Sequence, residues 1–337
     1  MSIKNLQDFR EKLSQLPLLN SSSEQTAVER NAQLTKPAGS LGTLEDLAIW
    51  AAAWQGQHPA SFNSPQIVIF AGNHGVCGQG ISAFPPEVTV QMVANFEHGG
   101  AAINQLAKAF GARFSVHPLQ LDTPTADFTT APALSEDELL TALNVGWNSV
   151  REDADFLVVG EMGIGNTTVA AALCSALFGG KGKDWAGPGT GVTEEGISKK
   201  AEVIDQGLDL HREILNDPIE ILRCLGGREL AAMAGAVLAA RYQSIPVILD
   251  GFVTCAAAAV LAKANPTALD HCVAGHVSAE PGHVHLLQKL KKKPLLDLGM
   301  RLGEGSGAAL ALGILKGAIA THSGMATFAE AGVSDKD

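Results

Sequence analysis

The sequence has few charged, aromatic and cysteine residues for its length. Charged residues make up only 18% of its 337 positions, and the formal net charge is −11. Nothing strongly basic offsets this charge except the run at 289–293, which is typical of a solvated helix end. Nucleic acid and anionic membranes are therefore disfavoured as partners. A small anion is not, because it needs only a local cluster of N–H groups.

Long apolar runs are also absent. One of the longest, at 306–315, is interrupted by glycine and stopped by Lys316, and the first residues show no apolar core of the signal-peptide kind. The five cysteines are scattered without a C-x-x-C pair, which favours reduced thiols. We therefore expect a cytoplasmic protein with no membrane partner.

Apolar and small residues dominate what is present. Hydrophobic residues make up 46% of the chain, and 36 residues are glycine. This composition supports a sizeable core, and the length fits one large domain with an appendage, or two domains.

Three apolar runs each end in a polar, glycine-bearing loop. They are Ile67–Phe70, Phe156–Val159 and Pro246–Asp250, and the last two lead into helices predicted over 169–178 and 253–264. Buried strands that alternate with loops and helices are typical of a parallel α/β sheet. Because the carboxyl ends of parallel strands meet at one edge, we expect the three loops to converge on one ligand site.

The first 60 residues predict helices instead. Ser23 is placed to cap a helix over 24–34, and Thr43 is placed to cap a second one. Between them, KPAGSLG at 36–42 breaks the helical pattern. The chain therefore begins with a helical region that precedes the α/β part.

The loop at 160–168 predicts an anion site. Its glycines let backbone N–H groups approach a ligand, and the polar side chains at 166–168 add donors at a helix N-terminus. It is not a Walker A loop, because no Lys-Ser/Thr pair follows the last glycine. A second loop, GPGTG at 187–191, precedes a helix that carries Lys200. Either loop alone fits a tight turn that needs positive φ, but two of them, each opening a helix, favour an anionic ligand.

Glu304 lies among glycines in RLGEGSGA, just before an apolar run. A carboxylate partly removed from water has a raised pKa, which suits a general base. An acid at a helix N-terminus, stabilised by the helix dipole, explains the same pattern. The spacing alone does not separate these two interpretations.

His276, His283 and His285 invite a metal-site interpretation. No cysteine or further carboxylate completes a recognised ligand set around them. We therefore expect no metal. Asn73–His74 and Asp250 follow strands, where polar side chains are well placed to face a ligand.

Eight motifs follow one another along nearly the whole chain: KPAGSLG (36–42), FAGNHGV (70–76), FPPEVTVQMVANFEHGGAAIN (84–104), GEMGIGNTT (160–168), GPGTG (187–191), LDGF (249–252), GHVSAEPGH (275–283) and RLGEGSGA (301–308). In this order they resemble the nicotinate-nucleotide–dimethylbenzimidazole phosphoribosyltransferases. One position departs from the family's pattern. Asn73 stands where the family commonly has Asp, which puts any charge-dependent role of that position in doubt.

The resemblance implies a Rossmann-like parallel sheet flanked by helices, with a small helical domain formed from both chain ends. In this sequence, residues 1–60 plus 305–337 would form the small domain, and residues 61–304 the large α/β catalytic domain. The resemblance also implies a homodimer. The helical beginning and the α/β middle, inferred from the residues themselves, agree with this architecture.

The resemblance further implies the reaction. Such enzymes move 5-phosphoribose from nicotinate mononucleotide to 5,6-dimethylbenzimidazole, which gives nicotinate and α-ribazole 5′-phosphate for the lower ligand of cobalamin. No metal and no organic cofactor is needed. Through its motif, Glu304 is implied as the base, with Glu161 as the next catalytic candidate. The substrate-binding candidates are Phe84, Gln91, Met162 and Leu302 around the benzimidazole, Gly163, Gly165, Asn166, Thr167 and Lys200 around the phosphate and ribose, and Asp250 together with Glu161 on the ribose or nicotinate side.

Two alternatives remain open. A related phosphoribosyltransferase could use another base or a phenolic compound as acceptor. The chain could also be a non-catalytic nucleotide-binding protein that keeps the glycine loops, although an intact Glu304 argues against this.

Overall fold

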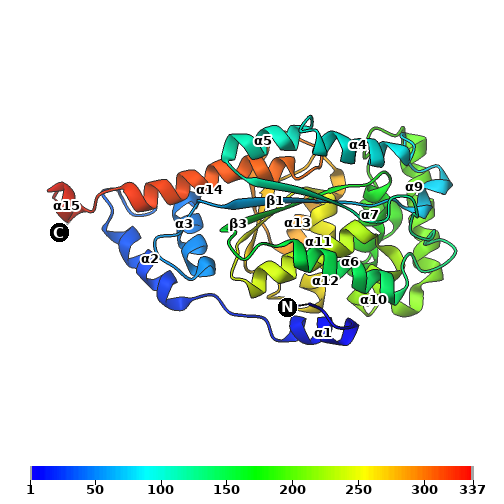
Figure 1. Ribbon diagram of the computed structural model, residues 1–337, viewed down its shortest axis with the longest axis horizontal. Coiled ribbons are helices and arrows are strands. Elements are labelled where there is room, and N and C mark those ends of the chain that lie inside the picture. Colours follow the sequence, from blue (N-terminus) through cyan, green and yellow to red (C-terminus); the bar gives the residue numbers. More distant parts are fainter. Residues whose placement is uncertain (1, 335–337) are drawn as a thin grey trace.

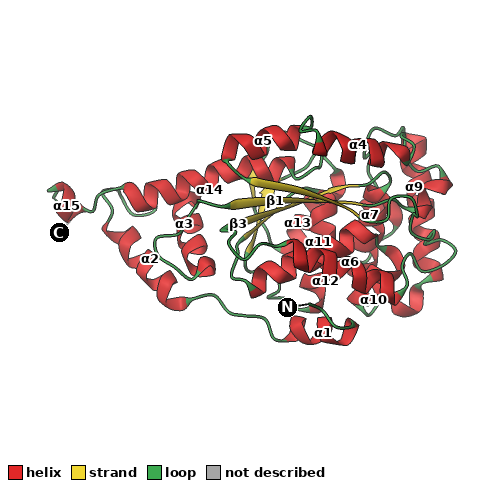
Figure 2. Cartoon of the chain, viewed as in Figure 1, coloured by secondary structure: helices red, strands yellow, loops and turns green. Residues whose placement is uncertain are grey.

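A computed structural model describes residues 2–334. Its centre is a six-stranded sheet in which every neighbouring pair is parallel, in the order β2-β1-β3-β4-β5-β6 (Figures 1 and 2). The strands are β1 (Pro65–Ala71), β2 (Arg113–Pro118), β3 (Phe156–Met162), β4 (Val247–Leu249), β5 (Cys272–His276) and β6 (Pro294–Leu296). The predicted parallel α/β sheet is confirmed, including the three strands located from sequence.

The central strands are buried on both faces, which explains their continuous apolar runs. All seven residues of β1 are buried. Val68 and Phe70 contribute to one hydrophobic core, and Ile67 and Ile69 contribute to another on the opposite face. This alternation follows from the two-residue period of a strand.

Helices cover the two faces of the sheet (Figure 1). On one face lie α6 (Glu136–Ser149), α7 (Asn166–Phe178), α10 (Pro218–Leu225), α11 (Arg228–Tyr242), α12 (Phe252–Ala264) and α13 (Pro281–Leu290). On the other lie α4 (Glu87–Glu97), α5 (Ala102–Phe110) and the first half of α14 (Ser306–Gly324). The long helix α9 (Glu194–Leu210) and the short elements η1 (Gly75–Gln79), α8 (Gly182–Trp185) and η2 (Arg212–Ile214) lie beyond the carboxyl edge.

The direction of chain winding reverses between β1 and β3. The connection from β1 to β2 runs through α4 and α5 on one face, whereas β2 returns to β3 through α6 on the other. In open parallel sheets, such a reversal leaves a crevice at the carboxyl ends of the two strands, where ligands bind. The topology therefore places the loops after β1 and β3 at the expected position of a site.

At the end opposite the carboxyl edge of the sheet, the molecule extends into a helical arm (Figure 1). The arm consists of α2 (Ser21–Gln33), α3 (Thr43–Gln55), the second half of α14, and α15 (Phe328–Ala331). Arg30 ties its parts together, because its guanidinium donates hydrogen bonds to the carbonyls of His322, Ser323 and Met325.

Helix α1 (Leu6–Ser14) does not join this arm. It lies under the main body, where Arg10 forms an ion pair with Asp217 at 2.7 Å and the Asn265 side chain donates to the Leu13 carbonyl. The residues predicted to form one small domain, 1–60 and 305–337, therefore include segments from both the arm and the main body. As a statement about independent domains, that division stays a prediction.

The predicted helix caps were wrong in detail. Helix α2 begins at Ser21 rather than after Ser23, because the side chain of Asn20 accepts a hydrogen bond from the Ser23 N–H at 2.9 Å. Helix α3 does begin at Thr43, but the residue before it, Gly42, provides no side-chain cap. The lysine run at 289–293 does span a helix end, yet Lys292 donates hydrogen bonds to two backbone carbonyls at 2.7 Å rather than being simply solvated.

Candidate active site

A pocket opens at the carboxyl edge of the sheet. Its lining comes from five stretches, within residues 161–167, 189–190, 251–253, 276–280 and 301–303. The loops after β3 and β4 line this pocket directly, as the sequence predicted. The loop after β1 lies behind them, and the N–H of Gly72 donates to the Met162 carbonyl at 3.0 Å.

The residues predicted at the end of β1 therefore do not face the pocket. His74 is 2% exposed, and its Nε2 lies 2.6 Å from a carboxylate oxygen of the equally buried Glu229. The Asn73 side chain donates a hydrogen bond to the Leu121 carbonyl at 3.0 Å. An ionised Asp could not make that bond, so the amide has a local structural use at this position.

The loop at 163–166 leads directly into α7. Gly165 adopts φ +89°, and a Cβ at this position would lie 2.5 Å from the Cys77 sulfur, so only glycine fits. The N–H of Ile164 donates to the Thr89 hydroxyl at 3.1 Å, which fixes the loop to α4. The loop is thus held rigidly at the N-terminus of a thirteen-residue helix, where the helix dipole favours an anion.

Lys200 joins the two glycine loops. Its ammonium donates to the Thr167 hydroxyl at 3.2 Å and to the Gly187 carbonyl at 3.1 Å, and the residue is only 3% exposed. Burial lowers the pKa of Lys200, and the charge of Glu280 opposes that shift. A buried cation at the meeting point of two glycine loops is well suited to a phosphate.

Glu304 lies on a stretch of left-handed backbone. Its φ is +61°, between +82° at Gly303 and +75° at Gly305. A non-glycine residue in this conformation is strained, and such strain persists mainly at functional sites. Glu304 is 5% exposed, and its Oε2 has no hydrogen-bond partner. Burial raises the pKa of Glu304, the backbone of Ile103 opposes the shift, and the charge of Asp250 adds to it.

Asp250 holds the Glu304 loop rather than lining the pocket. Its two carboxylate oxygens accept hydrogen bonds from the N–H of Gly305 at 3.2 Å and from that of Ala308 at 2.9 Å. It thereby caps α14 from a different part of the chain. His276 approaches the same carboxylate, with its Nε2 3.4 Å from Oδ1.

Glu161 lines the pocket and accepts a hydrogen bond from the Asn166 side chain. Burial, followed by the negative charge of Asp250, raises the pKa of Glu161 to about 8. At neutral pH this carboxyl group is therefore mainly protonated, so it can donate a hydrogen bond but is a poor proton acceptor.

The four predicted benzimidazole contacts divide into two pairs. Met162 and Leu302 line the pocket. Phe84 lies just before α4 and is 49% exposed, and Gln91 lies on α4 and is also exposed. Neither residue lines the pocket. The structure therefore brings only half of this predicted group to the pocket.

The three histidines do not converge. His283 Nδ1 accepts the Ser278 N–H at 2.8 Å, and its Nε2 faces the Cys255 sulfur at 3.3 Å. His285 instead stacks on Trp185, with ring centroids 4.4 Å apart. Within residues 2–334, no group of three histidine, cysteine or acidic side chains is arranged to hold a metal ion. The absence of a metal requirement stays a prediction.

Sequence analysis missed several residues that line the pocket. They are Ser278, Glu280 and Arg301, whereas Gly189 of the predicted loop GPGTG does line it. The first two lie inside the motif GHVSAEPGH, in which the histidines are the more conspicuous signal. Arg301 immediately precedes the Glu304 loop, and it donates to the Gly189 carbonyl at 3.3 Å.

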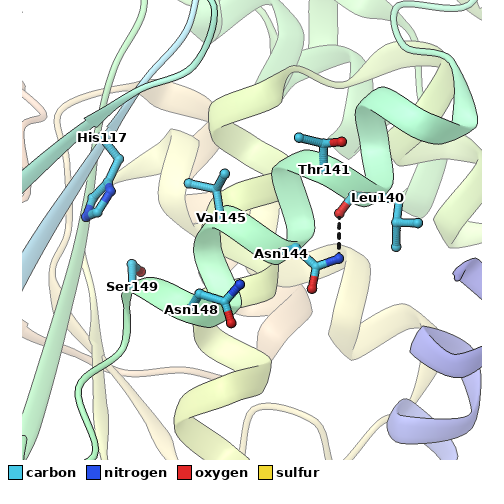
Figure 3. Close-up of a pocket in the computed structure, with 7 residues that line it drawn as sticks. All are labelled: His117, Leu140, Thr141, Asn144, Val145, Asn148 and Ser149. Atoms are coloured by element: carbon cyan, nitrogen blue, oxygen red, sulfur yellow. Dashed lines mark hydrogen bonds between the residues drawn. The ribbon is translucent and has the colours of Figure 1, made fainter. Parts of the chain in front are cut away.

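A separate hollow of about 540 Å³ lies along the outer side of α6, next to the edge strand β2 (Figure 3). Amide, hydroxyl and aliphatic groups line it, and its only ionisable side chain is His117, whose pKa burial lowers. It offers neither the cation nor the carboxylates found at the sheet edge. Across the described part of the chain, no helix is long and apolar enough to cross a membrane.

A pocket lined by a carboxyl group with a raised pKa, at the carboxyl edge of a parallel α/β sheet, is typical of an enzyme. The model of a family described as "Phosphoribosyltransferase" matches residues 16–333. The chain belongs to the nicotinate-nucleotide–dimethylbenzimidazole phosphoribosyltransferases.

Individual relatives support that membership. A protein of this name from Ruegeria sp. (strain TM1040) is 61% identical over 333 residues, covering 99% of this chain and 98% of the relative. Another from Jannaschia sp. (strain CCS1) is 64% identical over 91% of each chain. The crystal structure of the enzyme of this name from Thermus thermophilus is 39% identical, covers 94% of this chain and 100% of its own, and superposes with a TM-score of 0.86.

Proposed function

We propose that this chain transfers 5-phosphoribose from nicotinate mononucleotide to 5,6-dimethylbenzimidazole, giving nicotinate and α-ribazole 5′-phosphate for the lower ligand of cobalamin. The observation that carries the proposal is Glu304, a buried carboxylate with an unpartnered oxygen, on strained backbone beside a pocket suited to a phosphate. The names of the relatives supply the two substrates.

The nucleotide's phosphate binds where the two glycine loops meet. The N-terminus of α7 and the Lys200 ammonium offset its charge in an otherwise acidic protein. Glu161 and Asn166 lie on the pocket side of the same loop and address the ribose. Asp250 acts as a positioning residue, because it holds the backbone that carries Glu304.

The chemistry needs one proton acceptor. The bond between C1′ and the nicotinate nitrogen breaks, and its electron pair returns to the nitrogen, which neutralises the pyridinium charge. A lone pair on one benzimidazole nitrogen forms the new bond to C1′ from the opposite face, which gives the α linkage. The other ring nitrogen then carries a surplus proton, and Glu304 takes it. A carboxylate with a raised pKa is a better acceptor than an ordinary surface acid.

The test is Glu304→Gln, assayed with nicotinate mononucleotide and dimethylbenzimidazole by product analysis. Turnover should fall on the order of 10²–10⁴-fold, the usual cost of losing a positioned base, while nucleotide binding persists. Glu152→Gln, an exposed change at the far edge of the sheet, is the control. Near-parental turnover by the Glu304 variant would reject the role. A panel of other bases and phenols tests the acceptor, and nucleotide binding without turnover of any of them would indicate a non-catalytic protein.

We further propose that the protein is a homodimer in the cytoplasm, with the helical arm as a small domain. All five cysteines are free thiols, as expected in a reducing compartment. The arm projects from the main body and carries partly exposed apolar side chains, including Val28 at 43% exposure, which suits a symmetric interface. Light scattering that gives a monomer mass at working concentration would reject the dimer.

A further inference from the structure

Glu280 occupies an unusual place for its residue type. It is the residue that precedes α13, where Pro281 takes the first helical position. Acceptor side chains at such a position normally bond to the first free N–H groups of the helix, and Asp, Asn, Ser and Thr are preferred there because they are short enough. The Glu280 side chain makes no such bond. It points away from the helix that it begins.

The carboxylate of Glu280 is instead directed into the pocket. The residue is 5% exposed and belongs to the pocket lining, and neither of its oxygens has a hydrogen-bond partner of ordinary geometry within the protein. Buried carboxylates without partners are costly, so the missing partners point to a ligand. Burial raises the pKa of Glu280, and the Lys200 ammonium, the Gly189 backbone and Arg301 oppose that shift by favouring the charged form.

The surrounding structure holds the carboxylate in this direction. His283 accepts the Ser278 N–H through Nδ1, so its Nε2 carries the ring proton, and the Ser278 hydroxyl in turn accepts the Glu280 N–H at 3.3 Å. Gly187 leaves the necessary room, because a Cβ at that position would lie 2.2 Å from a Glu280 oxygen. Hydrogen bonds within residues 278–283 thus stabilise the turn that carries Glu280.

The position of the Glu280 carboxylate beside Lys200 determines which chemical groups of a ligand it can bind. Glu280 is an acceptor-only group, so it cannot itself hydrogen-bond to the phosphate that Lys200 offsets or to the nicotinate carboxylate, but it would bind hydroxyl groups well. In a ribonucleotide 5′-phosphate, the hydroxyls that lie near the phosphate are those of the ribose. We propose that Glu280 is a substrate-binding residue, whose carboxylate accepts hydrogen bonds from the ribose hydroxyls of the nucleotide and so selects ribose over deoxyribose. This inference rests on the proposed function for the identity of the nucleotide.

The test measures binding without an acceptor base, so that it does not depend on turnover. Calorimetric dissociation constants are determined for nicotinate mononucleotide and for its 2′-deoxy and 3′-deoxy analogues, with the parent, Glu280→Ala, Glu280→Gln and the control Glu152→Ala. The parent should prefer the ribonucleotide over at least one analogue by roughly 10- to 100-fold, the range for a hydrogen bond to a charged group. Glu280→Ala should weaken binding of the ribonucleotide and abolish that preference, whereas the control should keep it.

Glu280→Gln keeps the side-chain length, so it tests the role even if the alanine variant folds poorly. It should retain part of the preference, because its amide carbonyl can still accept one hydroxyl. Equal weakening of the ribonucleotide and of both analogues in folded variants would overturn the proposal and leave Glu280 as a positioning residue for Lys200. A parent that binds with ribose preference but forms no α-ribazole 5′-phosphate would reject the proposed reaction while supporting this inference.

Discussion

Two buried glutamates in different regions of the molecule show what distinguishes the site from the scaffold. Glu45 in the helical arm and Glu161 at the sheet edge are 8% and 9% exposed. Burial acts to raise the pKa of both. In the arm, the effect of burial is outweighed by hydrogen bonds from Lys36, Asn31 and a backbone N–H, and the pKa of Glu45 falls to about 2. At the edge, the charge of Asp250 adds to burial, and the pKa of Glu161 rises to about 8.

The two regions differ in whether a buried carboxyl group finds its hydrogen-bond partners within the protein or leaves an oxygen free for a ligand. Glu45 accepts hydrogen bonds from a side chain and from the backbone and forms an ion pair with Lys36 at 2.8 Å. Glu280 and Glu304, by contrast, have unpartnered oxygens and raised pKa values. Glu280 lines the pocket, and Glu304 lies on the loop directly after its lining residues 301–303. Titratable groups perturbed in this direction and found at one site are characteristic of active sites.

The first effect should come from removing each region's buried lysine, and it is the largest expected on nucleotide binding. Lys200→Ala should raise the dissociation constant for nicotinate mononucleotide by roughly 10- to 100-fold, because a charged hydrogen-bond donor to the phosphate is lost. Lys36→Ala should leave that constant unchanged but lower the free energy of unfolding by about 2 kcal/mol, since Glu45 loses its ion-pair partner. Calorimetry and denaturant unfolding measure the two quantities. The distinction between the regions fails if Lys200→Ala binds the nucleotide as tightly as the parent.

The second effect is a difference in pH dependence. The folded pKa of Glu161 lies above its ordinary value of 4.5, so the folded state binds more protons than the unfolded state between pH 4.5 and about 8. The free energy of unfolding therefore falls as the pH rises through this window. Glu161→Gln should reduce this decline by on the order of a few kcal/mol, since one pKa unit corresponds to about 1.4 kcal/mol.

Glu45 should behave in the opposite way. Its folded pKa of about 2 lies below the ordinary 4.5, so its stabilising contribution is complete above pH 4.5 and is lost as the pH falls towards 2. Glu45→Gln should weaken the acid sensitivity of the fold below pH 4.5 and leave the window from pH 5 to 8 unchanged. Denaturant unfolding of both variants and the parent at pH 3.5, 5, 6.5 and 8 separates the two cases. The same pH profile in both variants would contradict the contrast.

The sequence predicted the centre of the fold well, because β1 and β3 are buried on both faces and leave unbroken apolar runs. It missed β2, β5 and β6. The edge strand β2 (Arg113–Pro118) is exposed at its ends, and β6 (Pro294–Leu296) has only three half-buried residues, so neither carries that signal. Strand β5 contains Gly275 and His276, which interrupt the apolar pattern.

The site was predictable where function depends on backbone conformation. Glycines that bring N–H groups to a ligand are visible in the sequence, and so was Glu304 among its glycines. The role of Asp250 was not visible, because its hydrogen bonds to Gly305 and Ala308 join residues more than fifty positions apart. Glu280 was missed because its significance lies in partners that it lacks, which only the folded structure reveals.

The smallest effect compares two variants of similar stability cost. Asn20→Ala removes the side-chain cap of α2 in the arm and should lower the free energy of unfolding by about 1 kcal/mol. Thr89→Val removes the acceptor of the Ile164 N–H and should cost about 1–3 kcal/mol, since a buried donor is left unpaired. Only the second variant loosens the loop that begins α7. We therefore expect KM for nicotinate mononucleotide to rise severalfold in Thr89→Val, with little change in kcat, and to stay at the parental value in Asn20→Ala. Thermal unfolding and steady-state kinetics on the same preparations provide the check. If both variants shift KM alike, general destabilisation explains the change, and the loop has no special dependence on its attachment to α4.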